Sequence, residues 1–130
     1  MTWSRTLPDG PERHLVVDGA NVVGSRPDGW WRDRAGAAAR LAERLVAALD
    51  AGRLDAEHVY LVLEGAAKAA DVPAHPRLRV VRASADGDSA IVDVVAGLTD
   101  SAVTVVTADR GLRARLPSSQ VVGPSELLRR

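Results

Sequence analysis

A chain of 130 residues with 17 basic and 17 acidic side chains carries no net charge, which argues against a protein that coats nucleic acid through a broadly basic surface. Hydrophobic residues make up 46% of the chain, as in a globular α/β protein, and 130 residues suffice for one domain with its own core. The absence of Cys excludes disulfides, zinc–thiolate sites and a cysteine nucleophile. The opening MTWSRTLPDGPERH lacks the apolar run of a signal peptide, and no segment is long enough to cross a membrane, so we expect a cytoplasmic protein without a membrane partner.

Short β-branched runs alternate with helical patterns along the chain. Residues 1–13 are expected to form a loose lead-in, and 66–76 one helical turn followed by a loop. The other expected elements, in chain order, are a strand at 14–18, a long loop at 19–31, a helix at 33–51, strands at 58–63 and 78–82, a helix at 88–98, a strand at 103–106, a helix at 109–116, a short strand at 120–122 and a terminal turn at 125–129.

This alternation predicts a single-domain, three-layer α/β/α sandwich with a mostly parallel sheet of about five strands. Arginines interrupt the strand at 78–82, so we expect it near an edge of the sheet. Right-handed crossovers would bring the carboxyl ends of 14–18, 58–63 and 103–106 to one edge. In open α/β sheets, ligands bind at that edge.

Acidic residues occur where these segments end or begin. Asp18 closes the first strand in HLVVDGANVVG, Glu64 follows the second, Asp88 opens a helical pattern and Asp109 follows the strand at 103–106. Four carboxylates at one edge of a sheet predict a divalent-metal site, and oxygen ligands favour Mg²⁺ or Mn²⁺ over zinc.

Ordinary structural roles compete with this interpretation. An Asp that closes a strand can form an Asx turn, an Asp that opens a helix can cap it, and an acid before Gly can be a solvated turn residue. Asp18 could form an Asx turn, and Glu64 could be a solvated turn residue. Asp86 or Asp88 could cap the helix at 88–98, and Asp109 could cap the helix that follows it. Asp93 could be a solvated residue on the surface of its helix.

The segment GWWRDR adds aromatic and basic side chains beside the expected site. Trp30 and Trp31 offer flat surfaces for bases, and Arg26, Arg32 and Arg110 are candidates for binding phosphate, which together suit single-stranded RNA. In a protein without Phe, one of the two tryptophans is instead expected to fill the core beneath the loop.

Other catalytic patterns are missing from the sequence. It contains no GxxxxGK[ST] loop, no GxGxxG and no nucleophile elbow. The three histidines, His14, His58 and His75, fall away from the expected acidic edge.

The order of the four acids resembles that of the NYN branch of the PIN-like nuclease superfamily, in particular small single-domain actinobacterial members, some of which are labelled NTP pyrophosphohydrolases. The resemblance extends over almost the whole chain, through HLVVDGANVVGSRPDGWWRDR, LVLEG, GDSAIVD, VTVVTADRGLRARL and VVGPSELL. It implies a PIN-like fold, an acidic centre that binds Mg²⁺ or Mn²⁺, and cleavage of RNA.

When the family's roles are carried over by position, the resemblance implies that Asp18, Asp88 and Asp109 are the catalytic metal ligands and that Glu64 is a further ligand. Asn21 would position ligand or substrate. Two residues depart from the pattern: Glu64 stands where relatives more often have Asp, and Ser89 stands where many carry a second consecutive acid. The loss of that carboxylate weakens the case for a two-metal centre.

The sequence therefore predicts a metal-dependent ribonuclease that acts on single-stranded RNA. Its Trp pair, Arg26, Arg32 and Arg110 would guide the strand. An RNA-binding module with a degenerate site and a hydrolase of small nucleotides remain as alternatives. The sequence leaves the oligomeric state open, with a homodimer among the options.

Overall fold

A sheet whose strands all run parallel organises the computed structural model, which describes residues 12–98 and 102–128. Its five strands lie in the order β3-β2-β1-β4-β5. The expected bounds of β2, β3 and β5 are confirmed, whereas β1 and β4 each begin one residue earlier than expected. The strands are β1 (Arg13–Asp18), β2 (His58–Leu63), β3 (Leu78–Arg82), β4 (Ala102–Val106) and β5 (Gln120–Val122).

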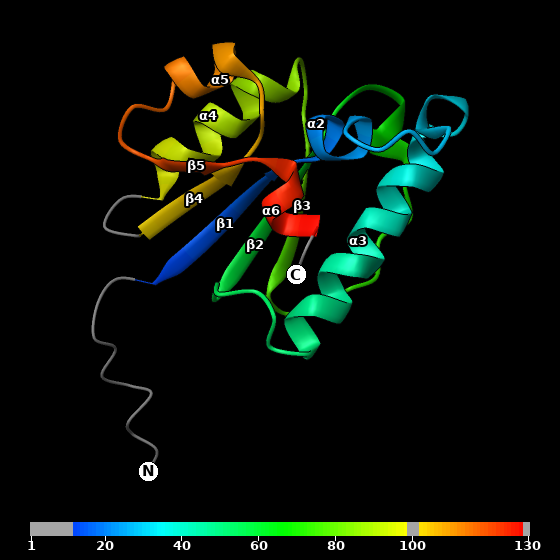
Figure 1. Cartoon of the computed structure of the whole chain (residues 1–130), viewed down its shortest axis with the longest axis horizontal. Helices are drawn as coiled ribbons and strands as arrows, with labels where there is room; N and C mark the ends of the chain where they lie inside the picture. The colour runs from blue at the N-terminus through cyan, green and yellow to red at the C-terminus, as the bar shows by residue number, and fades with distance from the viewer. Residues whose placement is uncertain (1–11, 99–101, 129–130) are drawn as a thin grey trace.

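Helices cover both faces of the sheet, which confirms the three-layer α/β/α sandwich (Figure 1). One face carries α2 (Gly19–Gly24), the long α3 (Arg34–Asp50) and α6 (Pro124–Leu128), and the other carries α4 (Gly87–Gly97) and α5 (Arg110–Ala114). Two 3₁₀ turns, η1 (Trp30–Arg32) and η2 (Gly65–Ala69), lie between these elements. In the described part of the chain, no helix is both long and apolar enough to span a bilayer.

The central strand β1 is buried on both faces. Val17 packs with α3 and Val16 packs with α4, and neither is exposed. Parallel strands covered by helices on both sides read as continuous apolar runs, and β1, β2 and β4 follow this rule. An acidic residue at the end of such a strand therefore lies at the border between a dry core and the edge of the sheet.

The segment 19–31 is not the long loop that the sequence predicts. Its first six residues form α2, and its last two belong to η1. The sequence GANVVG holds two Gly and two β-branched residues, so neither helix propensity nor periodicity indicates a helix this short. Its formation depends on tertiary structure, because Asp18 caps it and Gly19 allows it to pack closely on β2.

Helix starts differ from the expected bounds because the acids before them are caps. Asp33, Asp86 and Asp109 each accept a hydrogen bond from a backbone N–H three residues ahead, so α3, α4 and α5 begin one residue after them. Asp88 consequently lies in the first turn of α4 and is not its cap.

At the carboxyl end, the segment expected to form a terminal turn is the short helix α6. Of the expected lead-in, 1–11 lies outside the described residues, and Arg13 belongs to β1.

Gly19 is required by the packing of α2 on β2, and we expect Gly19→Ala to destabilise the protein. A Cβ at this position would lie 2.6 Å from the Val62 carbonyl oxygen and 3.0 Å from a methyl group of Leu63. A backbone oxygen in a central strand cannot move aside, so the expected loss is about 1–3 kcal/mol of unfolding free energy. Chemical denaturation measures it.

Gly97→Ala is the matched control, because no atom of the described residues lies within 4 Å of a Cβ at this position in the last turn of α4. This variant should be neutral or more stable by up to about 1 kcal/mol. An unchanged denaturation midpoint for Gly19→Ala would contradict the close packing of α2.

Candidate active site

Asp18 ends β1 as a buried carboxylate that is fixed from two sides. It is 5% exposed. The Thr107 hydroxyl donates to its Oδ2 at 2.8 Å, and the Asn21 backbone N–H donates to its Oδ1 at 3.3 Å. Burial raises the pKa of Asp18, and the charges of Asp88 and Glu64 raise it further, while the two hydrogen bonds oppose the shift. Asp18 is thus a helix cap, but a cap needs neither burial nor neighbouring acids, so capping alone does not explain its environment.

Thr107 connects the end of β1 to the end of β4. It is fully buried, and its hydroxyl oxygen also accepts from the Asp109 backbone N–H at 3.1 Å. Beside it, the Asn21 side-chain oxygen accepts from the Ala108 N–H at 2.8 Å. These bonds hold the first turn of α2 against the chain that leaves β4. Thr107 was not among the residues predicted to form the site; its signal in the sequence is a polar residue directly after an apolar strand.

Glu64 leaves the end of β2 and reaches the start of α4. Its Oε1 accepts from the Gly87 N–H at 3.2 Å. A Cβ at residue 87 would overlap that carboxylate, so only Gly allows the approach. Glu64 is partly buried and is therefore not the freely solvated turn residue that the sequence left open.

Asp88 faces other acids from the first turn of α4. Burial raises its pKa first, followed by the charges of Asp109 and Asp86, and Arg115 partly offsets them. Within the described residues, the Asp88 carboxylate accepts no hydrogen bond. Asp86, in contrast, caps α4 and accepts from both the backbone N–H and the hydroxyl of Ser89. Ser89 thus contributes a second bond to the helix cap in the position where a further acid was expected.

The four predicted acids share the carboxyl edge of the sheet, and they interact in pairs. Asp18 experiences the charges of Asp88 and Glu64, and Asp88 experiences that of Asp109. They do not form a closed cage: across 12–98 and 102–128, no three His, Asp or Glu side chains are close enough together to hold a metal ion. The acids are therefore gathered at one edge without a preformed set of three ligands.

The strand order of the sheet also places this edge where ligands of open α/β sheets bind. From β1 the chain proceeds to β2 and β3 on one side, and it later returns to β4 and β5 on the other. The strand order therefore reverses between β1 and β4, and ligands of open α/β sheets bind in the crevice at such a reversal. Asp18 and Asp109 flank it, and Thr107 bridges them by hydrogen bonds.

Trp30 and Trp31 differ in exposure. Trp30 is partly buried against Gly24, and the guanidinium of Arg34 lies 4.8 Å from the centre of its ring. Trp31 is 52% exposed, and Arg32 lies 5.7 Å from its ring centre. Neither tryptophan enters the fully buried core, and Arg34, the second arginine of GWWRDR, packs on the more buried one.

The remaining predicted basic residues lie apart from one another. Arg110 is exposed in the first turn of α5, next to Asp109. Arg26 lines a hollow of about 260 Å³ together with Arg40 and Arg44, and none of the four acids borders it. Arg110 is therefore adjacent to the acidic edge, whereas Arg26 belongs to a separate surface.

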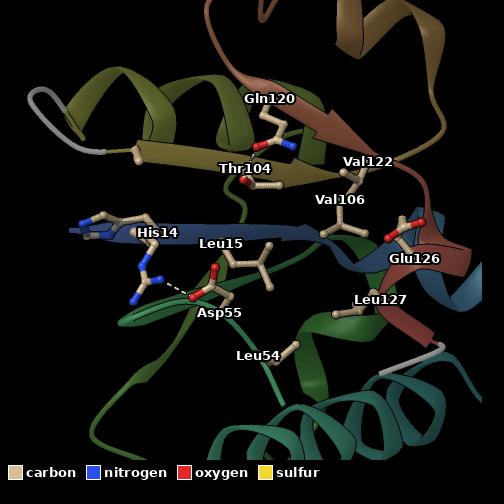
Figure 2. Close-up of a pocket in the computed structure, with 12 residues that line it drawn as sticks. His14, Leu15, Leu54, Asp55, Thr104, Val106, Gln120, Val122, Glu126 and Leu127 are labelled. Atoms are coloured by element: carbon tan, nitrogen blue, oxygen red, sulfur yellow. Dashed lines mark hydrogen bonds and ion pairs between the residues drawn. The ribbon is translucent and has the colours of Figure 1, made fainter. Parts of the chain in front are cut away.

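A hollow of about 330 Å³ lies on the α3 side of the sheet, over β1, β4 and β5 (Figure 2). Leu15 and Val106 form its floor on the sheet, and Leu54 and Leu127 lie across from them. Asp18, Glu64, Asp88 and Asp109 do not line it. It is therefore not part of the candidate site.

Comparison with solved structures supports the fold. A single-residue mutant of Rae1 (YacP) from Bacillus subtilis matches with a TM-score of 0.67 and 17% sequence identity, over 90% of this chain and 73% of that one. Rae1 without the mutation matches with a TM-score of 0.66 and 19% identity, over 88% and 71% of the two chains. No family model matches the chain, and no curated protein matches it by sequence. The likeness is therefore one of fold, and it agrees with the expected α/β architecture built on a parallel sheet.

Proposed function

We propose that this protein is a metal-dependent ribonuclease that hydrolyses phosphodiester bonds of single-stranded RNA. The observation that carries the proposal is the gathering of Asp18, Glu64, Asp88 and Asp109 at one edge of the sheet, where burial and mutual repulsion raise the pKa values of Asp18 and Asp88. A structural role does not require acids in this arrangement. A bound cation would offset their repulsion, and clusters of perturbed carboxyls are typical of catalytic sites.

The donor set fits a hydrated Mg²⁺ or Mn²⁺ ion. Mg²⁺ usually retains several waters and binds through one or two carboxylates, so it does not need three side chains in mutual contact. Asp18, Asp88 and Asp109 would hold the ion, some through its waters, and Glu64 would bind directly or through water. Such an ion would supply an activated water and would neutralise charge on the phosphate.

The chain's own groups would orient the reaction. Thr107 and the Asn21 backbone N–H fix both oxygens of Asp18, so this carboxylate is already ordered before substrate arrives. Arg110 would contact a phosphate next to Asp109. Trp31 and Arg32 would provide an exposed surface on which an unpaired strand can stack.

The test is cleavage of an end-labelled single-stranded RNA in Mg²⁺, in Mn²⁺ and in EDTA. We expect cleavage with either metal and none in EDTA, with activity restored when excess metal is added back. Absence of cleavage in both metals would refute the proposal. Cleavage that persists in EDTA would refute the metal dependence.

An RNA-binding module with a degenerate site is the second candidate. It is favoured by the absence of three mutually close acidic side chains among the described residues and by the use of Ser89 in the α4 cap. This candidate predicts RNA binding without turnover. The remaining alternative, a hydrolase of small nucleotides, is tested by adding a nucleoside triphosphate to the same assay. Hydrolysis of the nucleotide without cleavage of RNA would support it.

A further inference from the structure

A pocket of about 340 Å³ adjoins the acidic edge, between α2, the start of α3 and η2. Its volume falls in the range of about 300–1,000 Å³ that is typical of small-ligand sites. Gly19 and Glu64 both line it. Because Gly19 follows Asp18 directly and Glu64 is one of the four acids, the pocket lies directly beside the candidate active site.

The walls of this pocket suit a flat, neutral ring. Trp30 and Arg34 form one side, with the Arg34 guanidinium over the Trp30 ring at 4.8 Å from its centre. Small and apolar residues, among them Leu63 and Ala66, line the other sides. Aromatic rings and guanidinium planes are the surfaces on which proteins stack unpaired bases. The Glu64 carboxylate at the border would repel a phosphate, so the charged backbone of a strand would stay outside while a base enters.

We propose that this pocket receives one unpaired nucleobase of the strand, next to the phosphate that is cleaved. The inference rests on the proposed function and adds a requirement to it: the base must leave its stack and its partner. A base in a duplex cannot enter without unpairing, so the pocket would select single strands. It is distinct from the exposed surface of Trp31 and Arg32, because neither residue lines it.

The experiment combines abasic substrates with a variant that fills the pocket. One base is removed at a time around the cleaved bond, and kcat/KM is measured for the wild type and for Ala66→Leu. Ala69→Leu is the matched control, since Ala69 is an exposed residue of the same η2 turn that does not line the pocket.

For the wild type, we expect loss of one particular base to lower kcat/KM about tenfold, as loss of a stacked base does. Ala66→Leu should lower kcat/KM for the intact strand by a similar factor, and the abasic position should then have no further effect. Ala69→Leu should behave as the wild type. An equal effect of every abasic position, or full abasic sensitivity in Ala66→Leu, would overturn the inference.

A binding measurement separates failure of this inference from failure of the proposed function. If the wild type cleaves no RNA in either metal, the proposed function fails, and fluorescence anisotropy in EDTA tests the pocket without turnover. Tighter binding of the intact oligonucleotide than of the abasic one, with the difference lost in Ala66→Leu, would support the base pocket. Equal binding of the two oligonucleotides by the wild type would overturn it.

Discussion

The Asp18→Asn variant is expected to lose RNA cleavage by more than about a hundredfold, because the charge stabilisation that a metal provides at a phosphate amounts to several kcal/mol. Asn has the same shape as Asp, so it can keep the bond from the Asn21 N–H and can donate to the Thr107 hydroxyl. The fold should survive while the buried negative charge is removed. Initial rates in saturating Mn²⁺, with circular dichroism of both proteins, measure the two effects separately.

Asp93→Asn makes the same chemical change on the exposed surface of α4 and is the control. It should cleave RNA at the wild-type rate. Undiminished turnover by Asp18→Asn would show that the proposed site is wrong.

The same variant should be more stable than the wild type at pH 7 in the absence of metal. The folded-state pKa of Asp18 is raised, so the folded protein binds this proton more tightly than the unfolded chain does. Ionised Asp18 therefore destabilises the fold above its folded pKa. This cost is relieved as the pH falls and is absent below the ordinary value of 3.8. The stability difference between Asp18→Asn and the wild type should therefore become smaller as the pH is lowered toward 3.8. Denaturation at several pH values measures it.

Much of the fold could be predicted because its central strands β1 and β2 are largely buried and form short apolar runs. The run HVYLVL of β2 and the run LRVVR of β3 are delimited by their composition, and the arginines of β3 correctly indicated an edge strand. Arg82 extends from that edge to the carbonyls of Lys68 and Ala70. Helix α2 could not be predicted, since its stability comes from the Asp18 cap and from packing against β2, which local sequence does not record.

The acidic edge could be predicted for a topological reason. Parallel strands place their carboxyl ends together, so acids far apart in sequence had to approach one another once the sheet order was correct. Their separations could not be predicted, because these depend on side-chain rotamers and caps. Asp109, for example, directs one oxygen to the Leu112 N–H. Thr107 was missed because it acts through a hydrogen bond to Asp18, which is distant in sequence.

Thr107→Val is expected to weaken both the fold and the site, since one hydroxyl serves two partners. Val replaces the hydroxyl by a methyl group of similar size, which leaves the Asp109 backbone N–H without its acceptor and Oδ2 of Asp18 without its donor. An unsatisfied buried polar group costs about 1–3 kcal/mol of unfolding free energy. Loss of a residue that orients a ligand typically lowers metal affinity or activity by about 10–100-fold.

A pH profile distinguishes this role from simple destabilisation. The Thr107 hydrogen bond is the strongest influence that lowers the pKa of Asp18, so its removal should raise that pKa further. The acid limb of the rate profile, where Asp18 must be ionised, should then move to higher pH in Thr107→Val. Thr107→Ser retains the hydroxyl and should keep the wild-type midpoint even if the lost methyl group costs some stability. If Thr107→Val kept both the wild-type midpoint and the wild-type rate, Asp18 would not depend on Thr107, and the ordered carboxylate at the end of β1 would need another explanation.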